Sequence, residues 1–207
     1  MLITNLSMQK RNVSRVNISL DNEFRGVLFD EVVYQNKLKV GMDISEYDFN
    51  KLLDESNMHF CKNEAFNYLS RYIKTLKELK EHLYQKGYHK NQVEFAIENV
   101  QKYNLIDDRK YAEAYYNSHK DTKSTMLIKQ ALKDKGINDE IVEDVVVFDN
   151  DSELQLATKF VDKLARVQDN KITYKNLNRL KRQLVSRGIS YDTISKVTSQ
   201  FEIEYED

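Results

Sequence analysis

The sequence predicts a mainly α-helical protein, built from three tandem three-helix repeats in a curved array, with a small N-terminal segment that contains β-strands. Three observations predict this fold. Gly87, Gly136 and Gly188 are spaced 49 and 52 residues apart, and apolar side chains recur at the same offsets from each. The 207 residues include no proline and only five glycines, so few positions interrupt a helix. The first 29 residues show the alternation of apolar and polar residues that is typical of strands.

The N-terminal segment reads as two or three strands. Val16, Ile18 and Leu20 alternate with polar residues, which is the period of a half-buried strand. A polar turn follows, and residues 24–29 can return as the partner strand. Residues 3–8 could add a third strand. The predicted unit is therefore an antiparallel hairpin, to which residues 3–8 could add one strand.

Helices follow this segment. Ser45, with Asp48 three residues later, predicts a helix from about Ser45 to Asn57. Thr75 to Glu78 has the form of a capping box and predicts another helix, which should end at Gly87. Between these two, one apolar stripe predicts the first helix of repeat one, and it comprises Ala65, Tyr68, Leu69, Tyr72 and Ile73.

The repeat becomes visible when the three glycines are superposed. Apolar residues stand eight and four positions before each glycine and one, six and nine positions after it. In that order they are Leu79, Ile128 and Leu180; Leu83, Leu132 and Leu184; Tyr88, Ile137 and Ile189; Val93, Val142 and Ile194; and Ala96, Val145 and Val197. Each repeat is therefore predicted as helix, helix, glycine turn, helix.

The first helices of repeats two and three complete the scheme. Asp107 or Asp108 should cap the first, and Asp151 or Ser152 the second. The residues expected to face inward are Tyr111, Ala114 and Tyr115 in repeat two and Leu154, Ala157, Val161 and Leu164 in repeat three. Residues 167–172 should form a loop. The expected segments are residues 1–60 with the strands and a helix, 61–106 for repeat one, 107–149 for repeat two, and 150–207 for repeat three with an acidic tail.

Composition narrows the class of protein. The sequence contains no run of about 18 apolar residues, which a membrane span would require, and no secretory signal is evident at the N-terminus. The single cysteine, Cys61, fits a cytoplasmic location. The net charge of −1 conceals uneven segments, because residues 107–149 carry seven basic and ten acidic side chains while residues 171–188 carry six basic and none acidic. A strong binder of bare DNA would usually be basic overall.

No catalytic constellation stands out. The sequence lacks a glycine-rich phosphate loop, an HExxH motif and paired cysteines, so we expect no enzyme, no cofactor and no metal. His59 and Cys61 lie two residues apart, but a metal site would need further ligands. Asp107 and Asp108 are better explained as helix-capping residues than as acid/base groups. The tyrosines on apolar stripes, including Tyr72, are expected in the core.

Basic residues are the most informative candidates for binding. Lys80, Lys129 and Lys181 stand seven residues before each turn glycine, on the flank of the second helix. In repeat three, Lys175, Arg179 and Arg182 share one helix face, because they are spaced i, i+4 and i+7. The three equivalent lysines suit a phosphate backbone or an acidic protein surface, and they equally suit a solvated helix face. The acid-free basic stretch of repeat three is less easily explained as a solvated face.

The chain also resembles a known family. Residues 105–108, Leu-Ile-Asp-Asp, followed by Tyr111, Ala112 and Tyr115, are similar to the signature of RecX-type regulators of the RecA recombinase. The Lys/Arg-Gly-Tyr/Ile ending of each second helix is similar to theirs, and the resemblance covers about residues 60–200. The N-terminal strand segment resembles the extension found in Gram-positive members.

The resemblance implies a non-catalytic regulator. It would bind the RecA–DNA filament as a cytoplasmic monomer and contact single- or double-stranded DNA weakly and without sequence preference. It would inhibit RecA ATPase, strand exchange and coprotease activity in recombination, DNA repair and the SOS response. The residues expected to contact RecA or DNA are Lys77, Lys80, Lys129, Lys133, Lys175, Arg179, Lys181 and Arg182. Those expected to form the structural motif are Asp107, Asp108, Tyr111, Gly87, Gly136 and Gly188. Two alternatives stay open: a helix-turn-helix-like DNA-binding regulator, and a helical-repeat scaffold for another protein.

Overall fold

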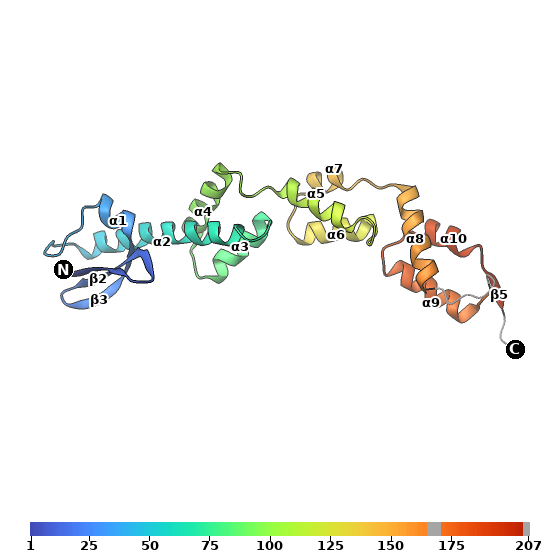
Figure 1. The fold of residues 1–207 in the computed structure, drawn as a ribbon, viewed down its shortest axis with the longest axis horizontal. Coiled ribbons are helices and arrows are strands. Elements are labelled where there is room, and N and C mark those ends of the chain that lie inside the picture. Colours follow the sequence, from blue (N-terminus) through green and yellow to red (C-terminus); the bar gives the residue numbers. More distant parts are fainter. Residues whose placement is uncertain (165–170, 205–207) are drawn as a thin grey trace. The chain divides into compact units, whose positions relative to one another are not determined.

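The computed structural model describes residues 1–164 and 171–204. The chain divides into two compact units, Met1–Ile106 and Asp107–Asp207. The first contains a β-sheet and one helical repeat, and the second contains two helical repeats (Figure 1). The mainly helical fold with a small strand segment, as predicted from the sequence, is confirmed.

A three-stranded antiparallel sheet opens the first unit. Its strands are β1 (Ile3–Gln9), β2 (Asn12–Leu20) and β3 (Glu23–Phe29), in that spatial order. Asp21 and Asn22 form the turn between β2 and β3 with φ of 50° and 66°, the backbone that a tight hairpin of two residues requires. Both sequence-predicted strands and the third strand are therefore present.

Two helices follow the sheet: the short α1 (Asp30–Gln35), which the sequence did not suggest, and α2 (Glu46–Leu69). The prediction of a helix ending near Asn57 and a new one starting near residue 64 was wrong, because α2 is continuous. The buried residues of its first half include Leu52 and Ser56, whereas those of its second half are Cys61 and Ala65. At about 100° per residue the step from 56 to 61 rotates the buried face by roughly 140°, so the apolar period breaks although the backbone does not.

The change of buried face has a structural cause. The first half of α2 packs on the sheet, with Phe49 and Leu52 in the same apolar cluster as Ile18 and Leu28. The second half belongs to the apolar cluster of repeat one. The expected division between residues 60 and 61 therefore falls inside one helix. Tyr72 and Ile73, expected on the apolar stripe, lie beyond the end of α2. They are 73% and 65% exposed, respectively.

Repeat one is completed by α3 (Leu76–Gln85) and α4 (Lys90–Lys102). The predicted capping box is present: Glu78 N donates to Thr75 Oγ1 at 3.2 Å, and Thr75 N donates to Glu78 Oε2 at 3.2 Å. Gly87 takes φ of 88° in the turn between α3 and α4. The second half of α2 supplies the first helix of this repeat.

The second unit holds two repeats of the same form. Repeat two consists of α5 (Asp108–His119), α6 (Thr125–Asp134) and α7 (Asp139–Val145). Repeat three consists of α8 (Asn150–Leu164), α9 (Tyr174–Val185) and α10 (Tyr191–Thr198). A parallel strand pair, β4 (Lys171–Thr173) and β5 (Glu202–Glu204), flanks repeat three.

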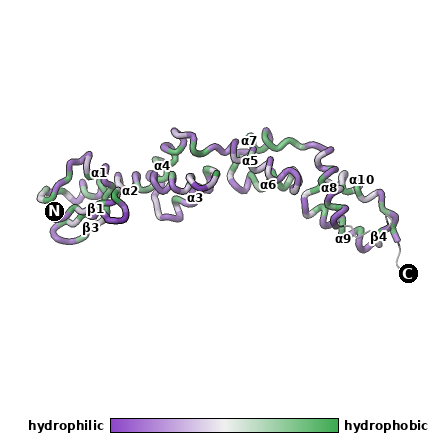
Figure 2. The backbone as a smooth tube through the Cα atoms, viewed as in Figure 1, coloured by the Kyte–Doolittle hydropathy of each residue, from purple (hydrophilic) through white to green (hydrophobic). Residues whose placement is uncertain are grey.

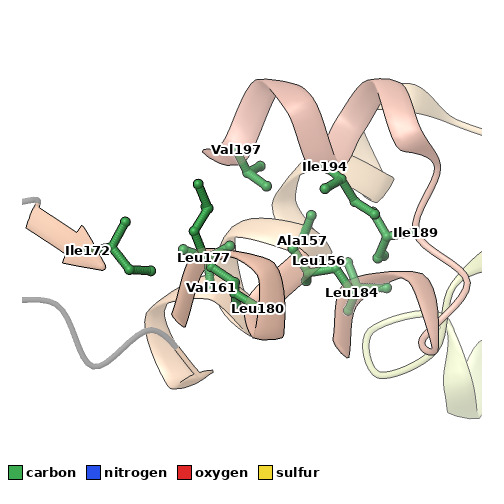
Figure 3. Close-up of a cluster of buried hydrophobic side chains, with 10 residues drawn as sticks. All are labelled: Leu156, Ala157, Val161, Ile172, Leu177, Leu180, Leu184, Ile189, Ile194 and Val197. Atoms are coloured by element: carbon green, nitrogen blue, oxygen red, sulfur yellow. The ribbon is translucent and has the colours of Figure 1, made fainter. Parts of the chain in front are cut away.

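The aligned apolar positions form the repeat cores. The residues eight and four positions before each glycine are at most 2% exposed in all three repeats. In repeat three, side chains from α8, α9 and α10 converge with Ile172 of β4 on one cluster (Figure 3). Along the helices, hydrophobic positions are interspersed with hydrophilic ones (Figure 2), as expected when each helix buries only one face.

Three details of repeat three differ from the prediction. Asp149, one residue before α8, supplies the cap in place of Asp151 or Ser152, because its carboxylate accepts from both of their backbone N–H groups at 3.2 and 3.1 Å. Leu154 is 38% exposed and Leu156 takes the buried position. Residues 171–173 form β4 where a loop was expected, and residues 165–170 of that expected loop lie outside the described residues.

Candidate interaction surface

Helix α9 carries the densest basic surface of the described residues. It begins after Thr173, whose hydroxyl oxygen accepts from Asn176 N at 3.3 Å, and no acidic residue occurs within it. Three of its apolar residues, Leu177, Leu180 and Leu184, are buried in the core of repeat three (Figure 3), whereas Val185 is 39% exposed. The face opposite this core is left to polar and charged side chains.

Three cations share the face opposite this core. Lys175, Arg179 and Arg182 are exposed, and Lys181 is half-buried on the adjacent flank. Across the described parts of the chain, none of these four has a carboxylate within ion-pair distance. The Arg182 Nε donates to the backbone oxygen of Asn178 at 3.3 Å, which holds it along the helix. The face thus presents several positive charges that form no ion pair within residues 1–164 and 171–204.

Exposed aromatic rings begin both α9 and α10. Tyr174, the first residue of α9, is 61% exposed, and Tyr191, the first residue of α10, is 78% exposed. Tyr174 and Lys181 are seven residues apart and therefore lie on the same flank of α9. Exposed rings next to cations are the combination on which nucleic-acid bases stack.

The equivalent surface in repeat one is weaker. Lys80, on α3, is exposed and has no ion-pair partner among residues 1–164 and 171–204. Lys77 lies one turn earlier, and its Nζ is 3.9 Å from the Glu81 Oε1. An exposed pair of this kind is worth little and can be exchanged for another anion.

In repeat two the candidate lysines form ion pairs with carboxylates of the same repeat. Lys129 forms an ion pair with Glu143, and the Lys133 Nζ lies 3.0 Å from the Asp139 Oδ1. Both acids belong to α7, so the third helix of this repeat supplies the counter-charges for its second helix. The three sequence-equivalent lysines, Lys80, Lys129 and Lys181, therefore have different surroundings.

The predicted motif residues lie at helix starts, in side-chain packing and in the glycine turns. Asp107 is the N-cap of α5 and accepts from Lys110 N at 3.0 Å, and this hydrogen bond lowers the pKa of the Asp107 carboxyl. Asp108 is in the first turn of α5. Tyr111 is half-buried, with the Lys135 Nζ 5.6 Å from its ring centroid. Gly136 and Gly188 take φ of 80° and 73°, like Gly87.

Cys61 and His59, the pair considered for a metal site, both belong to α2 in the first unit. Cys61 is fully buried, and burial raises the pKa of its thiol to about 12. His59 stacks on Phe29 with ring centroids 4.8 Å apart. Within the described residues no group of three His, Cys, Asp or Glu side chains could hold a metal ion. No described helix is long and apolar enough to cross a bilayer.

The fold and the surface define a modular protein of helical repeats that presents a one-sided basic helix. Two domain profiles match the chain: the N-terminal domain of the regulatory protein RecX over residues 1–45, and the second three-helix domain of RecX over residues 107–146. The regulatory protein RecX of Clostridium perfringens strain SM101 is 32% identical over 198 residues, which cover 94% of this chain and 93% of that protein. The chain belongs to the RecX family of regulatory proteins.

Two further comparisons agree with this assignment. The regulatory protein RecX of Clostridium botulinum strain Eklund 17B is 30% identical over 203 residues, covering 96% of this chain and 95% of that protein. A crystal structure of a regulatory protein RecX superposes with a TM-score of 0.70 at 24% identity, covering 96% of this chain and 98% of that one. This last likeness shows the fold.

Proposed function

We propose that this chain is a non-catalytic regulator that binds the RecA–DNA nucleoprotein filament. By occupying the filament it would inhibit RecA ATP hydrolysis, strand exchange and coprotease activity during recombination, DNA repair and the SOS response in the cytoplasm. Membership of a family of regulatory proteins supports the regulatory role. Binding to the DNA component is supported by one observation above all, the basic face of α9, whose cations have no ion-pair partner among the described residues.

The chemistry of this face suits phosphate contacts. Lys175, Arg179 and Arg182 project from one side of a rigid helix whose other side is anchored in a core. Three or four such contacts give binding that is weak, independent of sequence and sensitive to salt. A regulator of this kind gains affinity from engaging protein and DNA of the filament at once, rather than from DNA alone.

The ion pairs rank the candidate residues. Residues of α9 should contribute most, followed by Lys80, because neither set has to give up an internal partner. Lys77 should contribute less. Lys129 and Lys133 should contribute least, since an incoming phosphate would have to displace the carboxylates of Glu143 and Asp139.

The test is RecA ATP hydrolysis on single-stranded DNA with increasing amounts of the purified chain. We expect inhibition near stoichiometric amounts. The triple variant Lys175→Ala, Arg179→Ala, Arg182→Ala should inhibit less. The slope of its log DNA affinity against log salt concentration should be shallower by about 2, because each lost phosphate contact removes about 0.7. A charge-matched control is Lys51→Ala, Lys90→Ala, Lys102→Ala, three exposed lysines of the first unit, which should inhibit like the unmodified chain.

The outcomes separate the alternatives. No effect of the unmodified chain on RecA would contradict the proposal. Tight, sequence-selective binding to a short duplex without RecA would favour a helix-turn-helix-like regulator instead. The exposed acids of α7, Asp139, Glu140, Glu143 and Asp144, argue against a duplex reader in repeat two, because they would repel phosphates. Effects that persist unchanged in both triple variants would indicate a scaffold that binds protein alone.

A further inference from the structure

The last described strand, β5, lies beside the start of the basic helix. It runs parallel to β4, with Lys171 opposite Glu202, Ile172 opposite Ile203, and Thr173 opposite Glu204. Thr173 is the N-cap of α9. The fold therefore returns the acidic end of the chain to the point where its most basic helix begins, although about 30 residues separate them in the sequence.

Apolar contacts anchor the strand paired with β5 and the residue directly before it. Ile172 of β4 is 4% exposed and belongs to the core cluster of repeat three, where it lies next to Leu177 of α9 (Figure 3). Phe201, directly before β5, packs on the same cluster. The two glutamates of β5, in contrast, remain exposed. The strand is thus anchored by its neighbours while its carboxylates stay at the surface.

The carboxylates of β5 lie close to the start of α9. Glu202 and Glu204 are two residues apart and share one face of the strand with Lys171. The Lys171 Nζ is 3.7 Å from the Glu204 Oε1, so one of the six cations between residues 171 and 188 is already paired. Paired strands lie about 4.8 Å apart, which places Glu204 near Thr173, two residues before Lys175.

We propose that β5 is an internal counter-charge that weakens nucleic-acid binding by the basic face of α9. This inference rests on the proposed function, because it concerns the same surface. The glutamates compete with phosphates for Lys171 and lower the positive potential at the first turn of α9. A chain whose β5 is neutral binds single-stranded DNA more tightly than the natural one.

The experiment uses the full chain and a fluorescent oligothymidylate without RecA. The variant Glu202→Gln, Glu204→Gln keeps the strand but removes both charges. We expect its affinity to rise about fivefold at low salt, and its salt slope to steepen by up to about 1.4, the value for two further phosphate contacts on a single strand. A chain ending at Phe201 should bind at least as tightly as the double variant.

A matched control separates local from global charge. Glu23→Gln, Glu98→Gln changes the net charge equally on β3 and α4, and it should leave the affinity within about twofold of the natural chain. Equal affinity of the Glu202→Gln, Glu204→Gln variant and the natural chain would overturn the inference. So would an equal rise in the control, or no binding by any of these chains. Because RecA is absent, this result is independent of the ATPase test of the proposed function.

Discussion

Gly188 offers the sharpest test of how the repeats of the second unit pack. A Cβ added at Gly188 would collide with the Ser124 Oγ and lie 3.0 Å from the Leu127 Cγ. A Cβ added at Gly87, the equivalent glycine of repeat one, would meet nothing within 4 Å. Both glycines have positive φ, at 73° and 88°. They therefore share the same backbone requirement and differ in their surroundings.

The two substitutions should consequently differ in cost. Alanine at either position carries the left-handed backbone penalty, about 1–2 kcal/mol. Gly188→Ala adds the overpacking against Ser124 and Leu127, about 1–3 kcal/mol. We predict that Gly188→Ala destabilises its repeat by about 2–5 kcal/mol, whereas Gly87→Ala costs only the backbone part.

Native-state hydrogen exchange measures both costs in the full chain. The amides of α9 report on Gly188→Ala and those of α3 on Gly87→Ala, so no single unfolding transition has to be assumed for two compact units. Adding Ser124→Gly should restore part of the lost stability, because it removes the colliding hydroxymethyl group. Glycine remains an acceptable N-cap for α6, at a cost of a few tenths of a kcal/mol. Equal costs at the two glycines, or no recovery in the double variant, would refute the reasoning.

Three further predictions concern the first unit. Thr75→Ala should destabilise α3 by about 1–2 kcal/mol, because the buried capping box is lost. Ser45→Ala, at the exposed cap of α2, should cost about half as much. Urea unfolding measures both losses of stability. Burial lowers the pKa of His59, against the opposing effect of Glu31, so the stability conferred by its neutral ring is full above pH 6.5 and is lost as pH falls through the lowered folded-state pKa. His59→Phe keeps the stack on Phe29 and should reduce the loss of thermal stability on acidification; an unchanged loss would assign it to other groups. The Cys61 thiol, with its pKa raised to about 12 and no exposed surface, should resist alkylation in the folded chain and react only on unfolding, as mass spectrometry with and without denaturant would show.

Much of the architecture followed from local patterns. The capping box at Thr75, the cap at Asp107 and the glycine turns involve residues within a few positions of one another, so they are legible without tertiary information. The aligned apolar positions predicted the core for the same reason, since a helix face is determined by its period. Helix α2 shows the limit of this approach. Its buried face changes between Ser56 and Cys61 because two different neighbours cover its halves, and no local signal distinguishes that from a break.

The candidate surface depended on longer distances. Periodicity placed Lys80, Lys129 and Lys181 at equivalent points, but it could not say which of them faces a carboxylate. That is decided by α7, whose Glu143 lies 14 residues beyond Lys129 and reaches it only after the turn at Gly136. The exposed cations of α9 were identifiable from the absence of acids in residues 171–188, whereas β5 was not predicted at all.

The sequence by itself determined the repeat, its helix caps, its glycine turns and the basic character of α9, because each arises from interactions within one helix or one turn. Only the tertiary structure decided which cations are neutralised, where the sheet and repeat one share a helix, and that the acidic end of the chain returns to the start of α9. The physical reason is the range of the interactions. Ion pairs and strand pairing join residues that folding brings together, and local patterns in the chain do not show which residues become partners.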